Sequence, residues 1–316
     1  RAVMGSIFHA SSVFGTYLAA MVGFFVIAAG VWGDDTWRLG FLIGVVPALL
    51  TVWIRWKLRE PDQWLEAKQR AGDDPSQQPG RIAELFHRPN LRNTIVGVAL
   101  ATTGLATFWG AHIYGKNALM ASKRAEVLVD AGLTADSPES LREAAIQQRD
   151  SDIKRAEMLS MFVNTTGGGL GLLLFGWISN QLGRKGAFVF YHVGAFFISL
   201  VFFRFIIGGG APLWAVWVTL PVFGFLTLGM HAGYAVYFPE LYPTRLRGTG
   251  AGFCFNMGRL VTFPMLLLTG WMQRPTTEGG LGYSLEDAAS LLSWLFLLGV
   301  FVVLFAKETR GTALPQ

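Results

Sequence analysis

Eight long apolar stretches dominate this sequence of 316 residues. Each is close to the roughly 20 residues that a helix needs to cross a hydrocarbon core of about 30 Å. Hydrophobic residues make up 52% of the chain and charged residues 15%, which is far too few charges for a typical soluble domain. The predicted fold class is therefore an all-α integral membrane protein. The predicted spans are residues 6–32, 38–56, 94–115, 159–180, 186–206, 212–238, 249–272 and 288–306.

The basic residues of the short loops predict the orientation. If Arg1 lies inside, the loops at 55–92, 184–185, 245–247 and 307–310 share one side and carry most of the Lys/Arg excess. Such an excess marks the cytoplasmic face, so both termini are expected in the cytoplasm and the chain in a plasma (inner) membrane. The net charge of +5 follows from this topology and does not indicate nucleic-acid binding.

One arginine interrupts this pattern. Arg259 lies near the middle of the span 249–272, whereas the other basic residues lie in loops or near span ends. All the carboxylates lie outside the apolar spans, and Glu240 at a span end is the nearest to an exception. An anionic ligand, backbone carbonyls or a partner outside this sequence must therefore satisfy Arg259. Its planar guanidinium can donate two parallel hydrogen bonds to a carboxylate.

Polar residues inside the spans are the other candidates for a transport path, because lipid cannot satisfy them. Several recur three and four residues apart and so share a helix face. The alternative is that their hydroxyls bond only to their own helix, and that GGGLG at 167–171 only permits close packing. The candidate substrate-binding residues are Thr16, Thr103, Thr107, Asn164, Thr227, His231, Tyr234, Asn256 and Arg259.

Four motifs at span ends add a family resemblance. They are REPDQWL at 59–65, GWISNQLGRKG at 176–186, PELYPTRLRGTGAG at 239–252 and KETRG at 307–311. In this order they resemble the major facilitator superfamily, in particular its sugar-porter and organic-acid:proton symporter branches. The resemblance assigns a conformational motif to Gly176, Gly183, Arg184, Lys185, Glu240, Arg245 and Arg247. Asn180 stands where the family's turn has an aspartate, which puts the charge lock formed by that aspartate in doubt.

The superfamily has twelve helices in two halves, and this chain resembles helices five to twelve. The resemblance implies that residues 1–56 hold the last two helices of the N-terminal half and that 57–93 form the central cytoplasmic loop. Residues 94–316 would form the C-terminal half, with an external insertion at about 116–157. Four N-terminal helices would then lie outside this sequence.

The sequence favours a transporter over an enzyme. Cys254 is the single cysteine, and the five histidines form no metal-binding or catalytic pattern, so no catalytic residue, metal or cofactor is predicted. The predicted function is secondary transport of a small polar solute, an organic anion or a sugar, by alternating access. Proton symport is the favoured mechanism. A facilitative uniporter is the alternative, and a membrane-embedded enzyme ranks below both.

Overall fold

The computed structural model describes residues 1–60, 62–72, 79–134 and 136–315, and these residues form helices and connecting turns without a β-strand. Parts of the predicted central loop (Pro61 and residues 73–78) and of the insertion (Ala135) lie outside the described residues. The α-helices are α1 (Ala2–Ala10), α2 (Val13–Val22), α3 (Thr36–Lys57), α4 (Asp62–Ala71), α5 (Arg88–Gly110), α6 (Asn117–Asp130), α7 (Glu139–Gln148), α8 (Asp150–Val201), α9 (Leu213–Gly229), α10 (His231–Tyr237), α11 (Arg247–Gln273), α12 (Leu285–Leu292) and α13 (Leu295–Phe305).

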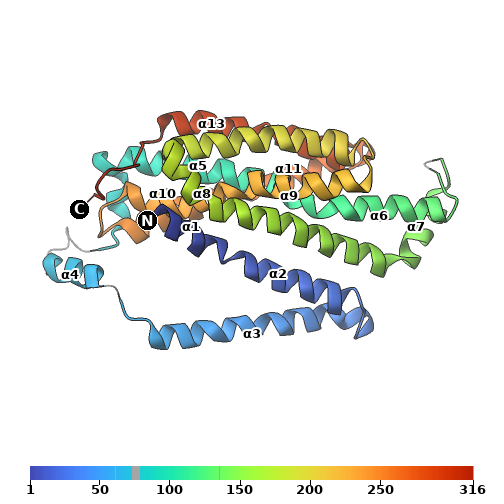
Figure 1. Ribbon diagram of the computed structural model, residues 1–316, viewed down its shortest axis with the longest axis horizontal. Helices are drawn as coiled ribbons and strands as arrows, with labels where there is room; N and C mark the ends of the chain where they lie inside the picture. Colours follow the sequence, from blue (N-terminus) through green and yellow to red (C-terminus); the bar gives the residue numbers. More distant parts are fainter. Residues whose placement is uncertain (61, 73–78, 135, 316) are drawn as a thin grey trace.

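Seven helical segments in the described part of the chain are long and apolar enough to cross a membrane, which confirms the all-α membrane class. One segment, Asp150–Ile207, has 58 residues and contains two predicted spans. Gly183, with φ 79° and ψ 171°, breaks its helical geometry between the two spans. Only glycine adopts such a φ readily, so the glycine of the predicted turn reverses the chain. Figure 1 shows the two arms of α8 running back alongside each other.

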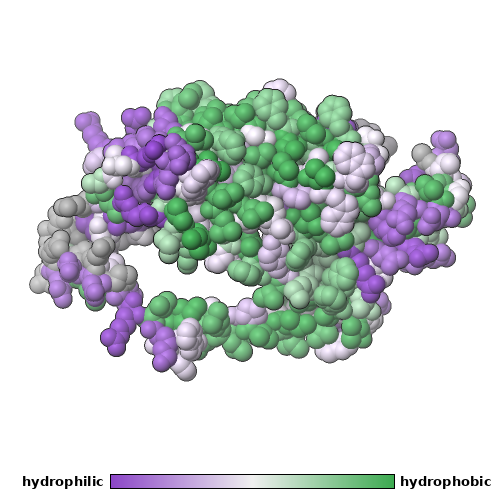
Figure 2. Space-filling view, in the orientation of Figure 1, coloured by the Kyte–Doolittle hydropathy of each residue, from purple (hydrophilic) through white to green (hydrophobic). Residues whose placement is uncertain are grey.

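The helices lie side by side, and both chain termini lie at the same end of the bundle (Figure 1). There the Arg1 side chain donates a hydrogen bond to the Thr312 carbonyl. The helix α8 packs against α9, α1, α6 and α13, and α11 packs against α5. The helix α3 stands apart, and no residue in its most apolar window is buried. Figure 2 shows a hydrophobic surface across the middle of the bundle and hydrophilic surfaces at both ends, as a membrane protein requires.

Glycines allow α8 and α9 to approach closely. A Cβ at Gly167 would lie 1.9 Å from the Pro221 carbonyl oxygen, and one at Gly171 would lie 2.3 Å from that of Phe225. Both distances are impossible, so the two backbones touch only because these residues lack side chains. The run GGGLG at 167–171 therefore permits close helix packing, which was the alternative to a role in a transport path.

The predicted insertion is helical. It comprises all of α6 and α7 and the start of α8. The end of α6, α7 and the start of α8 extend beyond the rest of the bundle (Figure 1). The helix α7 begins at Glu139, directly after Pro138. Ser137 could act as a cap of this helix by its place in the sequence, but it does not: its Oγ accepts a hydrogen bond from the Thr134 backbone N–H at 2.9 Å.

Candidate functional site

The helix pair α5 and α6 is broken at membrane depth. The helix α5 ends at Gly110, Ala111 has the non-helical angles φ −135° and ψ −58°, and a short 3₁₀ turn follows from His112 to Lys116. Non-helical backbone within a membrane is tolerated where protein or a polar cavity surrounds it, and it marks binding sites in many transporters. The break therefore locates the region in which solute contacts are expected.

Most of the candidate solute residues surround this break. Six of them are at least nine-tenths buried: Thr103, Thr107, Asn164, Thr227, His231 and Tyr234. The Tyr234 hydroxyl donates to the Leu100 carbonyl at 3.3 Å and lies so close to Gly104 that a Cβ there would be 1.6 Å from it. Gly104 is therefore required for Tyr234 to reach α5.

The candidate hydroxyls bond largely to their own helices. Thr103 donates to the Leu100 carbonyl at 3.0 Å, and Thr107 donates to the Gly104 carbonyl at 2.9 Å. Thr227 donates to the Phe223 carbonyl at 2.6 Å. Because each hydroxyl has one hydrogen, these three threonines can offer a solute only an acceptor oxygen.

His112 is a member of this region that the sequence reasoning missed. It is 6% exposed, its Nδ1 lies 2.6 Å from Thr227 Oγ1, and its ring stacks on Phe108 and Phe223. In the sequence, the surrounding residues FWGAHIYG have the composition of an apolar span. Gly110 and Gly115 are the residues from which a break near the histidine could have been predicted.

Three candidates lie on more accessible faces. Arg259 is exposed in this chain, and its guanidinium carbon lies 4.6 Å from the centre of the Phe255 ring. Asn256, one turn earlier, is also exposed and donates to the Gly252 carbonyl at 2.8 Å. Thr16 is half-buried on α2. Among the described residues, no carboxylate forms an ion pair with Arg259, in line with the sequence reasoning.

At the end of the bundle that holds both termini, Arg184 and Glu240 form a buried ion pair. Nε and Nη2 of Arg184 donate to the two carboxylate oxygens of Glu240 at 3.0 and 2.9 Å, and both side chains are 6% exposed. Thr309 donates its hydroxyl to Glu240 Oε2 at 2.6 Å, and Arg184 Nη1 lies 3.3 Å from Asn180 Oδ1. Such two-pronged, charge-assisted bonds are strong and fix geometry. We call Arg184, Glu240, Glu308 and Thr309 the Arg184 cluster.

Glu308 binds the turn at Gly183 through backbone N–H groups. Its carboxylate accepts from Arg184 at 2.9 Å and from Lys185 at 3.1 Å, and also from Thr309 and Arg310. Partial burial acts to raise the pKa of Glu308, but these backbone donors outweigh it together and lower the pKa below its ordinary value. The carboxylate from the motif KETRG therefore holds the reversal between the two arms of α8.

The remaining motif residues also make structural contacts. The Lys185 ammonium donates to the Leu304 carbonyl at 3.1 Å, and Arg247 Nε donates to the Pro239 carbonyl at 3.1 Å. A Cβ at Gly176 would lie 2.7 Å from the Ala2 carbonyl oxygen, so this glycine lets α1 approach α8. Arg245 forms an ion pair with Glu84. Glu84 is 6% exposed, so this ion pair is largely buried on the carboxylate side.

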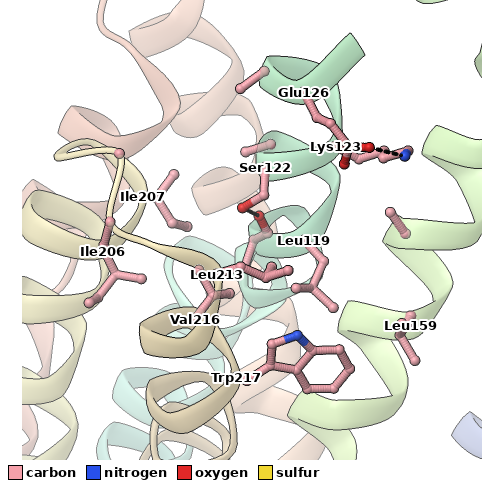
Figure 3. Close-up of a pocket in the computed structure, with 16 residues that line it drawn as sticks. Leu119, Ser122, Lys123, Glu126, Leu159, Ile206, Ile207, Leu213, Val216 and Trp217 are labelled. Carbon is pink, nitrogen blue, oxygen red and sulfur yellow. Dashed lines mark hydrogen bonds and ion pairs between the residues drawn. The ribbon is translucent and has the colours of Figure 1, made fainter. Parts of the chain in front are cut away.

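A cavity lies elsewhere in the described part of the chain. It has a volume of about 500 Å³ between α6, α8 and α9 and is lined mostly by aliphatic side chains, with Trp217 on one wall (Figure 3). An ion pair between Lys123 and Glu126 stands at its edge. None of the candidate solute residues lines this cavity, so its position does not support a role in solute binding.

Comparisons with known proteins find similar sequences among transporters. Residues 1–76 match the family described as sugar (and other) transporter. The chain is 27% identical over 313 residues to the cis,cis-muconate transport protein of Acinetobacter baylyi, covering 96% of this chain and 65% of that protein. It is 25% identical to the sialic acid transporter NanX of Escherichia coli, covering 83% of this chain and 55% of that protein. A probable 4-methylmuconolactone transporter of Cupriavidus pinatubonensis is 22% identical, with coverages of 90% and 56%.

The resemblance to the major facilitator superfamily is confirmed. The matched family and these relatives are named as transporters and not as enzymes, as predicted. The chain spans less than two thirds of the length of each of the three relatives.

The superfamily resemblance also clarifies the departure at Asn180. Where the family's turn has an aspartate, this chain has an amide whose oxygen accepts from Arg184. The negative charge beside Arg184 comes instead from Glu240, which is 56 residues further along the chain. The charge lock that the missing aspartate puts in doubt therefore has a substitute here, because a carboxylate still neutralises the buried arginine of the turn.

Proposed function

We propose that this chain belongs to a secondary transporter that moves a small organic anion across the membrane by alternating access. Residues 1–56 would complete the N-terminal half, 57–93 would link the halves, and 94–316 would form the C-terminal half. The end of the bundle that carries the Arg184 cluster and both termini would face the cytoplasm, as the basic loops indicate. The names of the relatives, which include carriers of muconate and sialic acid, favour an organic acid.

The observation that carries this proposal is the position of Arg259. It is the thirteenth of the 27 residues of α11, so it lies near mid-membrane, and it has no carboxylate partner in the described chain. Lipid cannot stabilise a charge at that depth, so this exposed face of α11 requires protein or a water-filled path beside it. An anionic solute passing along that path would supply the missing charge.

Uptake by the complete natural protein in proteoliposomes tests the role of Arg259. Replacing Arg259 with Lys keeps the charge but removes the planar fork, whereas Gln removes both. Transport should fall in that order, and the Gln variant should lose about tenfold or more in apparent affinity, because a charge-assisted hydrogen bond contributes roughly 1.5–3 kcal/mol. Arg204→Gln is the control, since Arg204 is exposed and paired with Asp287 near a span end.

The amount of each variant found folded in the membrane distinguishes a solute-binding role of Arg259 from a structural role. A solute-binding arginine can be replaced with little loss of folded protein, whereas an arginine that holds the halves together leaves a buried partner unpaired. An Arg259→Gln protein that expresses normally and transports organic anions with unchanged affinity would contradict the proposed role.

Proton coupling is the second part of the proposal. His231 is buried next to Phe108 and Tyr234, and histidine is the side chain that ordinarily titrates near neutral pH. If His231 carries the proton, His231→Gln should abolish accumulation driven by a pH gradient but leave solute exchange intact. Wild-type uptake that does not respond to a pH gradient would instead identify a uniporter.

A further inference from the structure

The cavity between α6, α8 and α9 lies where two membrane spans end. Ile206 and Ile207, the last residues of one helical segment, and Leu213, the first residue of α9, all line it. The turn that joins them is at the opposite end of these spans from the Arg184 cluster (Figure 1). The cavity is therefore at the boundary of the hydrocarbon core and not at the mid-membrane depth of Arg259.

Small side chains on α6 make room for the cavity. Four of them recur three and four residues apart, so they share one face of the helix, and all four line the cavity: Ala118, Ala121, Ser122 and Ala125. The volume of about 500 Å³ is within the range of about 300–1,000 Å³ that is usual for small-molecule sites. Water needs several polar partners to occupy a cavity, and this lining is mostly aliphatic, so an apolar occupant fits it better.

The cavity is accessible from the lipid that surrounds the bundle. Three of its lining residues, Leu159, Leu213 and Trp217, are 37%, 54% and 41% exposed. They belong to segments that are long and apolar enough to span a membrane, so their exposed surfaces face hydrocarbon. Tryptophan also favours the membrane boundary, where one part of its ring is apolar and the other is near water. An acyl chain can therefore enter the cavity sideways without crossing water.

An ion pair at one side of the cavity indicates the headgroup. Lys123 and Glu126 both line the cavity, and Lys123 Nζ lies 2.7 Å from Glu126 Oε1. Figure 3 shows the two side chains together, away from the apolar group of Leu119, Val216 and Trp217. The side chains of Lys123 and Glu126 are 30% and 56% exposed, so both charges can be reached from outside.

This pair complements a zwitterion. A lysine ammonium has three hydrogens, so Lys123 can donate to a phosphate while it donates to Glu126. The Glu126 carboxylate can accept from a primary ammonium, whereas a trimethylated ammonium has no hydrogen to donate. A headgroup with a net negative charge would satisfy Lys123 but would be repelled by Glu126.

We propose that this cavity binds an acyl chain of a phospholipid whose headgroup carries a phosphate and a primary ammonium. The phosphate would contact Lys123, and the ammonium would contact Glu126. Such a lipid would connect α6 of the external insertion to α8 and α9 of the bundle. This inference goes beyond the proposed transport function and does not depend on it, because none of the candidate solute residues lines the cavity.

Photocrosslinking of the complete natural protein in detergent micelles tests the proposal. The probe is a phosphatidylethanolamine with a diazirine at the end of one acyl chain, and the labelled peptides are mapped by mass spectrometry. The label should appear on the cavity walls in α6, α8 and α9. Unlabelled dioleoylphosphatidylethanolamine should compete about fivefold better than the phosphatidylcholine or phosphatidylglycerol with the same chains, because a partly exposed charged contact contributes up to about 1 kcal/mol.

Two variants address the two parts of the site. Ala121→Phe places a ring in the cavity and should remove the label from its walls. Glu126→Gln should abolish the preference for ethanolamine over choline but keep the labelling. Asp150→Asn is the matched control, because Asp150 forms an exposed ion pair with Lys154 one turn away on α8 and does not line the cavity. This control should change neither result.

The wild-type competition needs no variant, and thermal unfolding shows whether each variant is folded. Equal competition by the three lipids would mean that any alkyl chain enters the cavity, and it would overturn the proposal. Labelling of the same peptides by a folded Ala121→Phe protein would also overturn it. Neither result involves solute uptake, so the failure of this proposal is distinct from a failure of the proposed function.

Discussion

The buried pair of Arg184 and Glu240 allows a quantitative test of what holds the two arms of α8 to the end of α10. Replacing Glu240 with Gln keeps the shape but leaves a guanidinium that is 6% exposed without its counter-charge. Removing one partner of a buried pair costs roughly 3–5 kcal/mol. If this cost falls on the state in which the pair is formed, the population of the locally opened state should rise roughly 150- to 4,000-fold.

Cys254 provides the assay. It is the single cysteine of the chain, it is fully buried, and its Sγ lies 3.2 Å from the Tyr242 hydroxyl in the segment that follows Glu240. Its alkylation by a maleimide requires local opening. When reclosing is faster than alkylation, the labelling rate follows the open population. Glu240→Gln should therefore accelerate labelling of the purified chain by two orders of magnitude or more.

Two controls complete this test. Asp287→Asn removes the partner of Arg204 in a pair that is about half exposed, and such pairs contribute about 0–1 kcal/mol. Its labelling rate should rise less than about fivefold. The double variant Arg184→Met/Glu240→Gln should recover much of the lost protection, because the uncompensated charge is gone. A Glu240→Gln chain that labels within about threefold of wild type would refute the reasoning.

Two further predictions concern the turn that Glu308 holds. Gly183→Ala should destabilise the chain by roughly 1–3 kcal/mol, because φ 79° and ψ 171° lie in a region that is essentially restricted to glycine, and a Cβ would also lie 2.6 Å from Glu308 Oε2. Thermal unfolding measures this loss, and Gly44→Ala, a helical site with open space around it, should be neutral or slightly stabilising. Because the folded-state pKa of Glu308 is lowered, its contribution to stability is present above its unfolded pKa of about 4.5 and is lost as the pH falls through the lower folded value. Glu308→Gln should reduce the loss of stability at acidic pH. An unchanged dependence of stability on acidic pH would show that the pKa of Glu308 does not differ between the folded and unfolded states.

The membrane spans could be predicted from the sequence because their signal is local. A run of about 20 apolar residues predicts a membrane-spanning helix wherever it occurs in a chain. The predicted limits lie within or close to the observed helices. The Gly183 turn was equally visible, since a glycine beside basic residues separates two apolar runs. The depth of Arg259 also followed from its position in one helix.

The contacts of the site could not be predicted because they depend on distant parts of the chain. Glu240 was identified as a span-end carboxylate, but nothing local shows that it pairs with Arg184. The stripe of Thr227, His231 and Tyr234 does not show that the threonine hydrogen goes to its own helix. His112 escaped notice because the break around it is a change in backbone angle and not in hydropathy.

One short segment connects His231 of the proposed solute site with Glu240 of the Arg184 cluster. The helix α10 begins at His231, and the 3₁₀ turn that follows it contains Glu240, so nine residues, or about 14 Å of helix, separate His231 from the Arg184 cluster. Tyr237, three residues before Glu240, donates its hydroxyl to the Lys307 carbonyl at 2.8 Å and connects this stretch to the segment that holds Glu308.

A rearrangement that parts Arg184 from Glu240 must therefore bend this element or displace His231. Substitutions at sites about 10 Å or more apart normally add within roughly 0.5 kcal/mol when they share no element. In the complete natural protein, we expect Glu240→Gln and His231→Phe to be non-additive, by more than that margin, in the binding of whichever organic anion is recognised. The four proteins of the cycle are compared by calorimetry, with Asp287→Asn in place of Glu240→Gln as the additive control. Strict additivity would mean that α10 bends freely and that the Arg184 cluster stabilises the fold without affecting the solute site.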